Sequence, residues 1–316
     1  MAQTLAVAPN EAVEEAALAA KTVTRKRRWP TPGAALGMIW LLAITFMAVF
    51  ADQLPFIRDF GQTVQVNGES ANRYALGPGW TAWFGTDSLG RDVFSKCIYG
   101  ARTTLLVAVV ATAIGLGVGG LIGIVAGYRR GVTDRVTGIV TDCLLALPPI
   151  VLAIVMVYKL DVLKDDQTWL EWLDRRWQIT LTLGIIAIAP LARIVRAQTL
   201  SLREREFVLA ARSLGARTGR ILWREILPNL VPTMMTVAFT GLGLLIAAEG
   251  GLAFIGLSVE IPTPTWGKLI EANRTNIEDG WWATIFPCLM LFVTVLSFNL
   301  IGDWFARRFD IREATI

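Results

Sequence analysis

The chain has 316 residues, of which 54% are hydrophobic and only 18% are charged, and its formal net charge is +4. An average soluble domain carries about 25% charged residues, so this composition argues against a soluble enzyme and for a protein embedded in a membrane. The chain contains no histidine, which excludes a histidine-dependent catalytic triad and a histidine-based zinc site.

Two further kinds of site are excluded by motifs that the sequence lacks. No G-x-x-x-x-G-K-[ST] occurs, so we expect no ATP site of the Walker type in this chain. The three cysteines, Cys97, Cys143 and Cys288, are far apart and indicate neither a disulfide framework nor a cysteine metal site. We therefore expect no metal site.

We interpret residues 1–32 as a cytoplasmic tail. Residues 1–24 are polar and rich in Ala and Glu, and four basic residues at 25–28 precede an apolar block at 33–51. A secretory signal peptide has a different order of segments, so this block is expected to be an uncleaved anchor. We place the first transmembrane helix at 33–53 and an extracytoplasmic loop at 54–100.

The second apolar block, residues 103–126, carries no charge and is long enough to cross a bilayer, which needs about 20 apolar residues. A spacing of four places four glycines on one helix face; they are Gly115, Gly119, Gly123 and Gly127. Glycine lets a neighbouring backbone approach closely. The face is either a pore-side or inter-subunit seam, or ordinary packing within the bundle, and both interpretations predict a tightly packed helix.

Two more blocks precede the longest polar stretch. Residues 136–158 form the third block, and residues 179–192 form a short fourth block that is expected to take flanking residues at both ends. The segment between them, residues 159–178, carries apolar side chains near one helix face: Trp169, Leu170, Leu173 and Trp177. This pattern predicts a helix that lies along the outer membrane interface.

Residues 193–229 form the longest cytoplasmic stretch and are strongly basic. Within it, four residues recur at helical spacing and predict a short amphipathic helix: Phe207, Ala210, Ala211 and Leu214. Gly215 is expected to end this helix, and a second helical run at 220–227 is expected to end at Pro228. The stretch is either a basic surface against solvent or lipid, or a helix for a protein cleft. The small apolar area of the two alanines favours the cleft.

The last two blocks are residues 230–257 and 281–302. We therefore predict an all-α membrane protein with about six transmembrane helices. Five of these helices lie in a core at residues 101–306, which is followed by a cytoplasmic tail at 307–316.

Two ionisable residues lie inside the expected spans, where such groups are costly and usually face a partner or a wet cavity. Asp142 lies near the cytoplasmic start of the third span, and a structural pair with Arg193 or Arg196 is expected. Glu249 lies toward the outer end of the fifth span. It either reaches the headgroup region or belongs to a pathway through the membrane.

The placement of Lys and Arg predicts the orientation. If the N-terminus is cytoplasmic, the cytoplasmic segments hold most of the 30 Lys and Arg residues, and most of the 12 Trp residues fall near the membrane interfaces. We therefore expect both termini in the cytoplasm. The basic excess is a topology signal, and no nucleic-acid partner is expected.

The basic stretch resembles the EAA motif of ABC importer permeases. Leu209-Ala210-Ala211, then Gly215, then Leu227-Pro228 match its spacing, with Leu209 at the family's glutamate position and Glu225 at its usual isoleucine position. Three other places resemble the C-type (DppC/OppC-like) permease subunits of dipeptide/oligopeptide importers: residues 84–92, residues 251–257 with 262–267, and residues 299–304. The resemblance covers about residues 84–312, and the first span more loosely.

The resemblance implies a type I ABC importer permease fold in the bacterial cytoplasmic (inner) membrane. It implies four kinds of partner: a B-type permease, two ATPase subunits, an extracytoplasmic binding protein and membrane lipids. ATP and Mg would be bound by the ATPase subunits, so this chain is expected to hold no cofactor and not to be an enzyme. The coupling loop would be residues 199–229, and its contact residues would be Phe207, Leu209, Ala210, Ala211, Arg212, Gly215 and Ala216.

The expected function is that of a peptide-importer permease that forms half of the translocation pathway. The same machinery also imports glutathione or nickel chelates in related systems, and the residues do not select among these substrates. A membrane enzyme would need clustered polar groups at one depth, and a stand-alone carrier would need more ionisable residues than Asp142 and Glu249.

Overall fold

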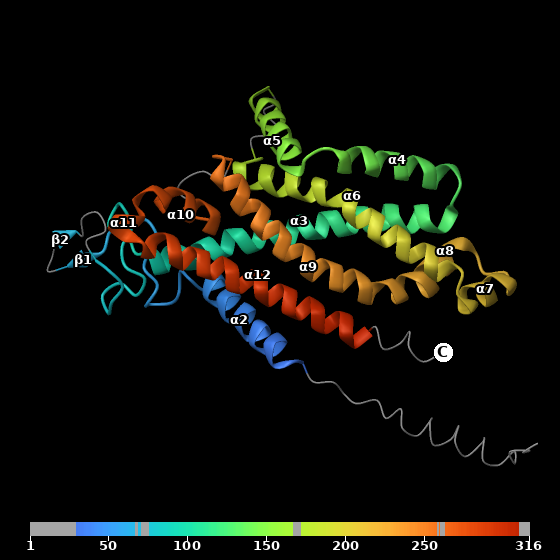
Figure 1. The fold of residues 1–316 in the computed structure, drawn as a ribbon, viewed down its shortest axis with the longest axis horizontal. Coiled ribbons are helices and arrows are strands. Elements are labelled where there is room, and N and C mark those ends of the chain that lie inside the picture. The colour runs from blue at the N-terminus through green and yellow to red at the C-terminus, as the bar shows by residue number, and fades with distance from the viewer. Residues whose placement is uncertain are drawn as a thin grey trace, which may run out of the picture.

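A computed structural model describes residues 30–66, 69–70, 76–166, 172–257, 259 and 263–309. Most of the expected N-terminal tail, together with Trp169 and Leu170, lies outside these residues. Long helices run side by side and form an elongated bundle (Figure 1). Among the residues that the structure describes, five helical segments are long and apolar enough to cross a membrane: Pro32–Val49, Val93–Arg129, Arg175–Arg203, Thr218–Phe254 and Trp282–Arg308. A bent helix pair makes a sixth if it is counted as one span.

The first two spanning helices are α2 (Pro32–Val49) and α3 (Val93–Arg129). Helix α3 begins earlier than the expected loop boundary at residue 100. Asp92 explains this start, because its carboxylate accepts the N–H of Ser95 at 3.1 Å and caps the helix. The N-terminal part of α3 therefore projects from the apolar block into the segment that was assigned to the loop.

The third apolar block is not one straight helix, which corrects the sequence-based expectation. Helix α4 (Val132–Ala146) ends at Leu147, and α5 (Pro149–Asp166) starts two residues later at an angle of 94° to it. Leu147 is extended (φ −82°, ψ 134°), which is the conformation that a following proline imposes. The pair Pro148-Pro149 thus breaks a block whose hydrophobicity alone indicated continuity.

Helix α6 (Arg175–Arg203) extends beyond the short fourth block at both ends, as expected. The interfacial helix predicted at residues 159–178 is not formed as one unit. Its first residues belong to α5, and its last belong to α6, which begins after the N-cap Asp174. The Asp174 carboxylate accepts the N–H of Trp177 at 3.0 Å, so the cap starts a new helix within the segment.

The chain then forms α7 (Glu206–Ser213), α8 (Thr218–Arg220), the π-helical turn η2 (Ile221–Ile226) and α9 (Leu227–Phe254). Contrary to expectation, Pro228 does not end a helix. The N–H of Leu227 bonds to the carbonyl of Leu222, five residues earlier, and Pro228 occupies the first turn of α9, where a missing N–H costs little. Thr218–Phe254 is consequently one helical rod of 37 residues.

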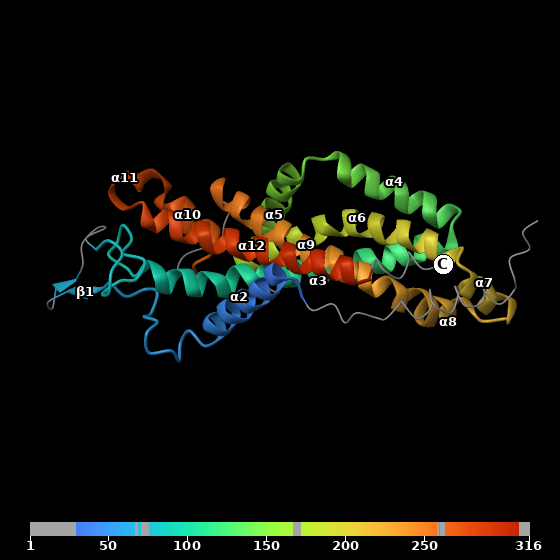
Figure 2. The same cartoon turned by 60° about the horizontal axis from the view of Figure 1, so that its bottom comes forward.

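Helix α10 (Trp266–Asn273) packs against α3, α9 and α12 (Trp282–Phe309), and η3 (Arg274–Asn276) and α11 (Ile277–Gly280) connect α10 to α12. The fully buried Trp266 donates its ring N–H to the carbonyl of Cys97 at 2.8 Å. At this end of the bundle, β1 (Gln65–Val66) and β2 (Glu69–Ser70) form a small antiparallel pair. We call this end the α10 end and the opposite one the α7 end (Figures 1 and 2).

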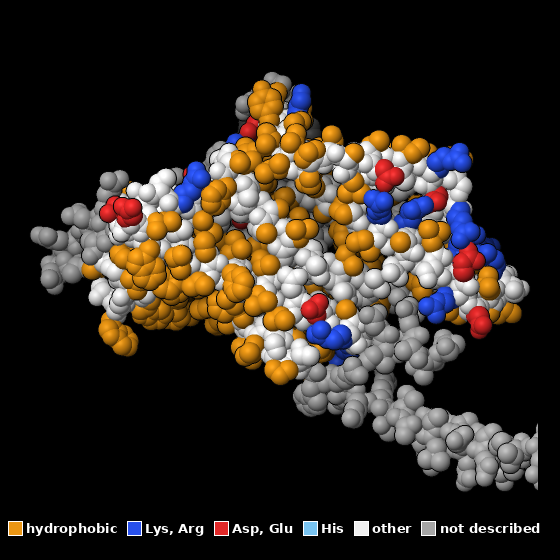
Figure 3. All heavy atoms as spheres, in the orientation of Figure 1, with side chains coloured by type: hydrophobic (Ala, Val, Ile, Leu, Met, Phe, Trp, Pro, Cys, Tyr) orange, Lys and Arg blue, Asp and Glu red, His pale blue; other side chains and the backbone are white. Residues whose placement is uncertain are grey.

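Hydrophobic side chains cover much of the surface of the helices, while Lys and Arg gather at the α7 end (Figure 3). Many large apolar residues of the spanning helices are exposed, including Leu42 in α2, Leu121 in α3 and Leu244 in α9. Exposed apolar surface of this extent marks contact with lipid or with other membrane helices. The start of α2 and the end of α12 both point toward the α7 end (Figure 1).

Candidate functional site

The segment between the spanning helices α6 and α9 contains the predicted coupling residues. Arg205 (φ −73°, ψ 147°) leaves the helical conformation and starts α7. At the other end of α7, Gly215 has φ +76°, a conformation that glycine adopts without steric cost. The N–H of Ala216 returns to the carbonyl of Ala211 at 3.1 Å. The predicted short helix and its glycine stop are therefore both present.

Helix α7 has one buried face and one exposed face. Val208 is fully buried, and Ala211 and Ala216 pack half-buried against the cluster formed by Ile221, Ile226 and Leu230. The exposed side consists of Phe207, Leu209, Ala210, Arg212 and Leu214. Leu214 is 87% exposed. The predicted face at Phe207, Ala210 and Leu214 is thus free within the described chain, whereas Ala211 belongs largely to the inner side.

A shallow hollow of about 390 Å³ adjoins the C-terminal end of α7. Its lining combines small, apolar and charged residues: Ala211, Leu214, Gly215, Ala216, Arg217, Arg220 and Glu225. An added Cβ at Gly215 would meet no atom within 4 Å. The hollow can receive a side chain of a partner protein. Its edge offers that side chain positive charges at Arg217 and Arg220 and a negative charge at Glu225.

Tyr128 at the end of α3 holds this segment in place, and no pattern in the sequence indicated this role. The guanidinium of Arg203 lies 5.8 Å from the centre of its ring, and that of Arg212 in α7 lies 5.7 Å from it. Arg203 also donates to the carbonyl of Tyr128 at 2.7 Å. Cation–π contacts of this kind stabilise by about 0.5–1 kcal/mol at exposed sites. Tyr128 therefore connects α3, α6 and α7.

The four glycines of α3 lie along α6. An added Cβ would stand 2.7 Å from the Cβ of Ala187 at Gly115, and 2.6 Å from the carbonyl oxygen of Ala192 at Gly123. At Gly127 it would stand 2.8 Å from the carbonyl oxygen of Arg196. The two backbones thus approach over three turns, closer than any side chain permits. Within this chain, the glycine face is a helix-packing seam.

Asp142 lies 3.6 Å from Arg193, which was one of its two expected partners, and both side chains are largely exposed. Arg196, the other expected partner, is paired with Asp134 at the start of α4. Sequence reasoning did not find Asp134, because this residue precedes the third apolar block at 136–158. An ion pair as exposed as that of Asp142 adds little stability.

Glu249 is only 1% exposed. Neither carboxyl oxygen forms a hydrogen bond within the described chain, although the Thr265 hydroxyl is close enough to interact with it. The structure therefore buries the carboxyl between α9 and α10.

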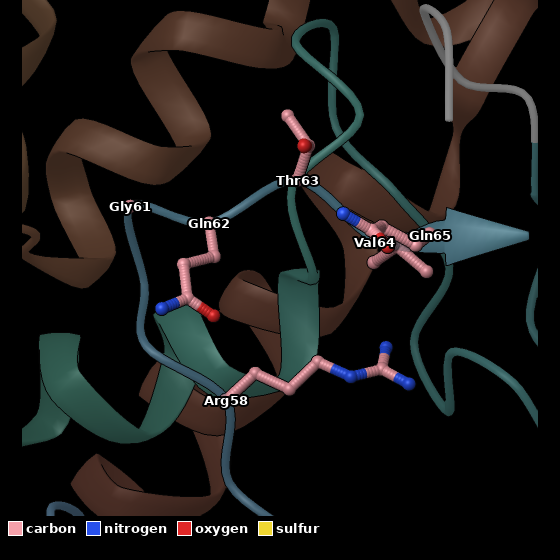
Figure 4. Close-up of a pocket in the computed structure, with 6 residues that line it drawn as sticks. All are labelled: Arg58, Gly61, Gln62, Thr63, Val64 and Gln65. Atoms are coloured by element: carbon pink, nitrogen blue, oxygen red, sulfur yellow. The ribbon is translucent and has the colours of Figure 1, made fainter. Parts of the chain in front are cut away.

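The α10 end carries a second, polar hollow of about 560 Å³, lined by Arg58, Gly61, Gln62, Thr63, Val64 and Gln65 (Figure 4). Beside it, a buried ion pair joins the preceding loop to α3. Asp87 contacts Lys96 and, at 3.2 Å, Arg91. Burial raises the pKa of Asp87, but the charge of Lys96 and the N–H groups of Arg91 and Leu89 outweigh it, so this pKa lies below its ordinary value. The pair fixes the loop on the start of α3.

Comparison with known proteins places the chain among transport proteins. The profile of the family described as "Binding-protein-dependent transport system inner membrane component" matches residues 119–312. The dipeptide transport system permease protein DppC of Alkalihalophilus pseudofirmus is 33% identical over 270 residues, which cover 85% of this chain and 83% of that protein. The glutathione transport system permease protein GsiD of Pectobacterium atrosepticum has the same identity and coverage.

A putative peptide permease protein of Brucella suis is 34% identical over 237 residues, which cover 74% of each chain. Among solved structures, the inward-facing MetNI methionine ABC transporter matches with a TM-score of 0.56 at 18% identity. The match covers 68% of this chain and 97% of that chain. At this identity the likeness concerns the fold, which is that of an ABC transporter permease.

Proposed function

The chain belongs to the family of binding-protein-dependent transport system inner membrane components, and from this premise we propose that it is the C-type permease subunit of an ABC importer for peptides. It is a multi-pass membrane protein with a transport role. In the proposed complex it forms half of the translocation pathway. A B-type permease forms the other half, two ATPase subunits supply the energy, and an extracytoplasmic protein delivers the substrate.

The exposed face of α7 is the single observation that carries this proposal. Phe207, Ala210 and Leu214 are exposed on a helix whose other face is anchored by the buried Val208. A short rigid helix of this kind can enter a cleft of an ATPase subunit and pass on its movement. Because ATP and Mg would bind in the ATPase subunits, this chain needs no nucleotide site and does not act as an enzyme.

In the proposed orientation the α7 end and both termini lie in the cytoplasm. The gathering of Lys and Arg at the α7 end supports this arrangement (Figure 3), as do the directions of α2 and α12 (Figure 1). The α10 end, with the polar hollow at Arg58 and Gln62, then faces the binding protein. ATP binding would alternate the pathway between inward-open and outward-open states.

Peptides are the proposed substrates because two of the relatives named above are described as dipeptide or peptide permeases. Glutathione is the second candidate, since an equally similar relative is a glutathione permease. Dipeptides and glutathione are both small peptides with free carboxylates, so one permease architecture suits both substrates. In such systems the binding protein carries much of the selectivity, and the permease sequence need not differ.

Competitive uptake in cells tests the substrate class. A strain that expresses the chain with the adjacent importer genes is given a labelled dipeptide, labelled glutathione or a labelled nickel chelate, and the same strain lacking only this chain serves as control. We expect chain-dependent dipeptide uptake that unlabelled dipeptides suppress. Uptake of glutathione or the nickel chelate alone would contradict the choice of dipeptides as substrates, while uptake of none would contradict the importer assignment.

A further inference from the structure

Glu249 has no role in the mechanism described so far, yet it lies inside the membrane-spanning rod Thr218–Phe254. It is 1% exposed, and neither of its carboxyl oxygens has a hydrogen bond within the described chain. A buried polar group without a hydrogen bond costs free energy. An ionisable residue kept at such a place in a membrane span points to a function.

The first turn of α10 lies opposite this carboxyl. The N–H of Trp266 donates to Thr104 at 3.2 Å, and that of Lys268 donates to Thr265 at 3.1 Å. Between them lies Gly267, where an added Cβ would stand 3.4 Å from Oε2 of Glu249 and 2.8 Å from the Cα of Gly250. The carboxyl therefore faces the first turn of α10.

Helix α10 is fastened to α3 on its other side. Trp266 bonds to α3 twice, through its ring N–H to the carbonyl of Cys97 and through its backbone N–H to Thr104. A contact between Glu249 and α10 consequently connects α9 to α3 at the α10 end. At this contact, a carboxyl of α9 meets α10, which the two bonds of Trp266 hold against α3.

The other end of the same rod begins beside α7. Thr218–Phe254 runs unbroken from the α7 end to the α10 end (Figure 1). A helix of 37 residues is about 55 Å long at 1.5 Å per residue. A displacement imposed at the α7 end can therefore be carried along one continuous helix to the surroundings of Glu249.

We propose that Glu249 is a positioning residue that ties the far end of α9 to the N-terminus of α10, so that α9, α10 and the start of α3 move as one unit during transport. The inference rests on the proposed transport function. The carboxyl acts through its contact with the first turn of α10 and the adjacent Thr265. Loss of the carboxyl leaves the subunit assembled but lets α9 move without α10, and ATP hydrolysis then proceeds without import.

Substitution by leucine separates this role from simple space filling. Replacing a buried charged group by an apolar side chain of similar size is often neutral or stabilising, so a Glu249→Leu subunit should assemble at least as well as the wild type. If Glu249 only filled space, that variant would also transport normally. Glu249→Gln keeps the shape and a polar oxygen while removing the ionisable group.

The first measurement is the amount of ATP hydrolysed per labelled dipeptide imported, by the complete complex in proteoliposomes. Gly251→Ala is the matched control, because an added Cβ there meets no atom within 4 Å. We expect the ratio to rise about tenfold in Glu249→Leu, which corresponds to about 1.4 kcal/mol, to rise less in Glu249→Gln, and to stay unchanged in Gly251→Ala. A wild-type ratio in Glu249→Leu overturns the proposal. If the leucine variant does not assemble, a wild-type ratio in Glu249→Gln overturns it.

A second measurement does not depend on the substrate. Spin labels at Leu244 of α9 and Ala272 of α10, both exposed, report the distance between the helices in the nucleotide-free and the vanadate-trapped complex. We expect the same distance in both states for the wild type and a second or broadened distance for Glu249→Leu. If the distance in the wild type changes between the two states, the proposed tie between α9 and α10 is overturned. A wild-type complex that imports no peptide contradicts only the proposed substrate.

Discussion

Gly119 of α3 lies so close to α6 that a Cβ added to it would stand 2.6 Å from the carbonyl oxygen of Ile188. Real side chains do not approach a backbone oxygen to this distance. Three further glycines repeat the approach along the same face, so the seam is a continuous feature of the α3–α6 pair. The two helices can form this contact only where α3 has no side chain.

Substitution in the seam is therefore expected to reduce the amount of assembled subunit. Gly119→Leu should overpack the contact at a cost of about 1–3 kcal/mol. Gly117→Leu is the matched control on the same helix, because an added Cβ at Gly117 meets no atom within 4 Å. The measurement is the yield of monodisperse protein after solubilisation. Equal yields from both variants would show that the seam contributes nothing to assembly.

The ion pair of Asp87 and Lys96 is expected to contribute strongly to the stability of the loop before α3. Both side chains are nearly buried, and removal of one partner of a buried pair costs about 3–5 kcal/mol. Asp87→Asn should therefore lower the midpoint of thermal inactivation, while the double variant Asp87→Asn/Lys96→Met should recover part of the loss. A double variant less stable than Asp87→Asn would contradict this account.

The same pair predicts a dependence on pH. Because the pKa of Asp87 is held below 3.8 in the folded chain, the unfolded state binds more protons near this pH, and stability rises with pH there. The contribution is complete above the ordinary pKa and is lost as the pH falls through the lower folded value. Wild-type stability should thus fall more steeply below about pH 4 than that of Asp87→Asn. Parallel curves would contradict the assignment.

Much of the fold follows from the sequence alone. Uncharged blocks such as that of α3 specify spanning helices, and the helical recurrence of Phe207, Ala210 and Leu214 specifies α7. The glycine at 215 correctly marks its end, since φ +76° suits no other residue as well. These features are local, so one stretch of chain contains the whole physical cause.

The features that sequence reasoning missed depend on neighbours distant in the chain or on competing local effects. Pro228 was expected to end a helix, but the π-helical turn before it removes the conflict with the backbone. Glu249 near the headgroups or in a pathway stays a prediction, but no sequence pattern indicated that the residue is buried against the start of α10. The contacts of Tyr128 with Arg203 and Arg212 join three helices, and no pattern within one helix indicates them.

Accessibility to an impermeant thiol reagent tests the proposed orientation. In a variant whose three native cysteines are replaced, single cysteines at the exposed positions Thr275, near α11, and Ser213, in α7, lie at opposite ends of the bundle. We expect labelling of Thr275→Cys in intact cells and of Ser213→Cys only after the membrane is opened. Labelling of Ser213→Cys in intact cells would reverse the orientation.

Acidic substitutions on the exposed face of α7 are expected to weaken docking without disturbing the fold. Leu214 is 87% exposed, so Leu214→Asp leaves the inner face at Val208 intact. Copurification of the ATPase should fall about tenfold, which corresponds to about 1.4 kcal/mol. Thr133→Asp, exposed at the start of α4, is the control and should copurify normally. Full ATPase recovery with Leu214→Asp would show that α7 is not the docking helix.

ATP-dependent uptake into proteoliposomes decides whether the chain works as a permease subunit of an importer. The chain is reconstituted either alone or with the partner permease, the ATPase subunits and the binding protein, and import of a labelled dipeptide is measured with and without ATP. We predict import by the complete complex with ATP, and no import by the chain alone. Equal uptake by the chain alone without ATP would contradict the assignment as a permease subunit and identify it as a self-sufficient carrier.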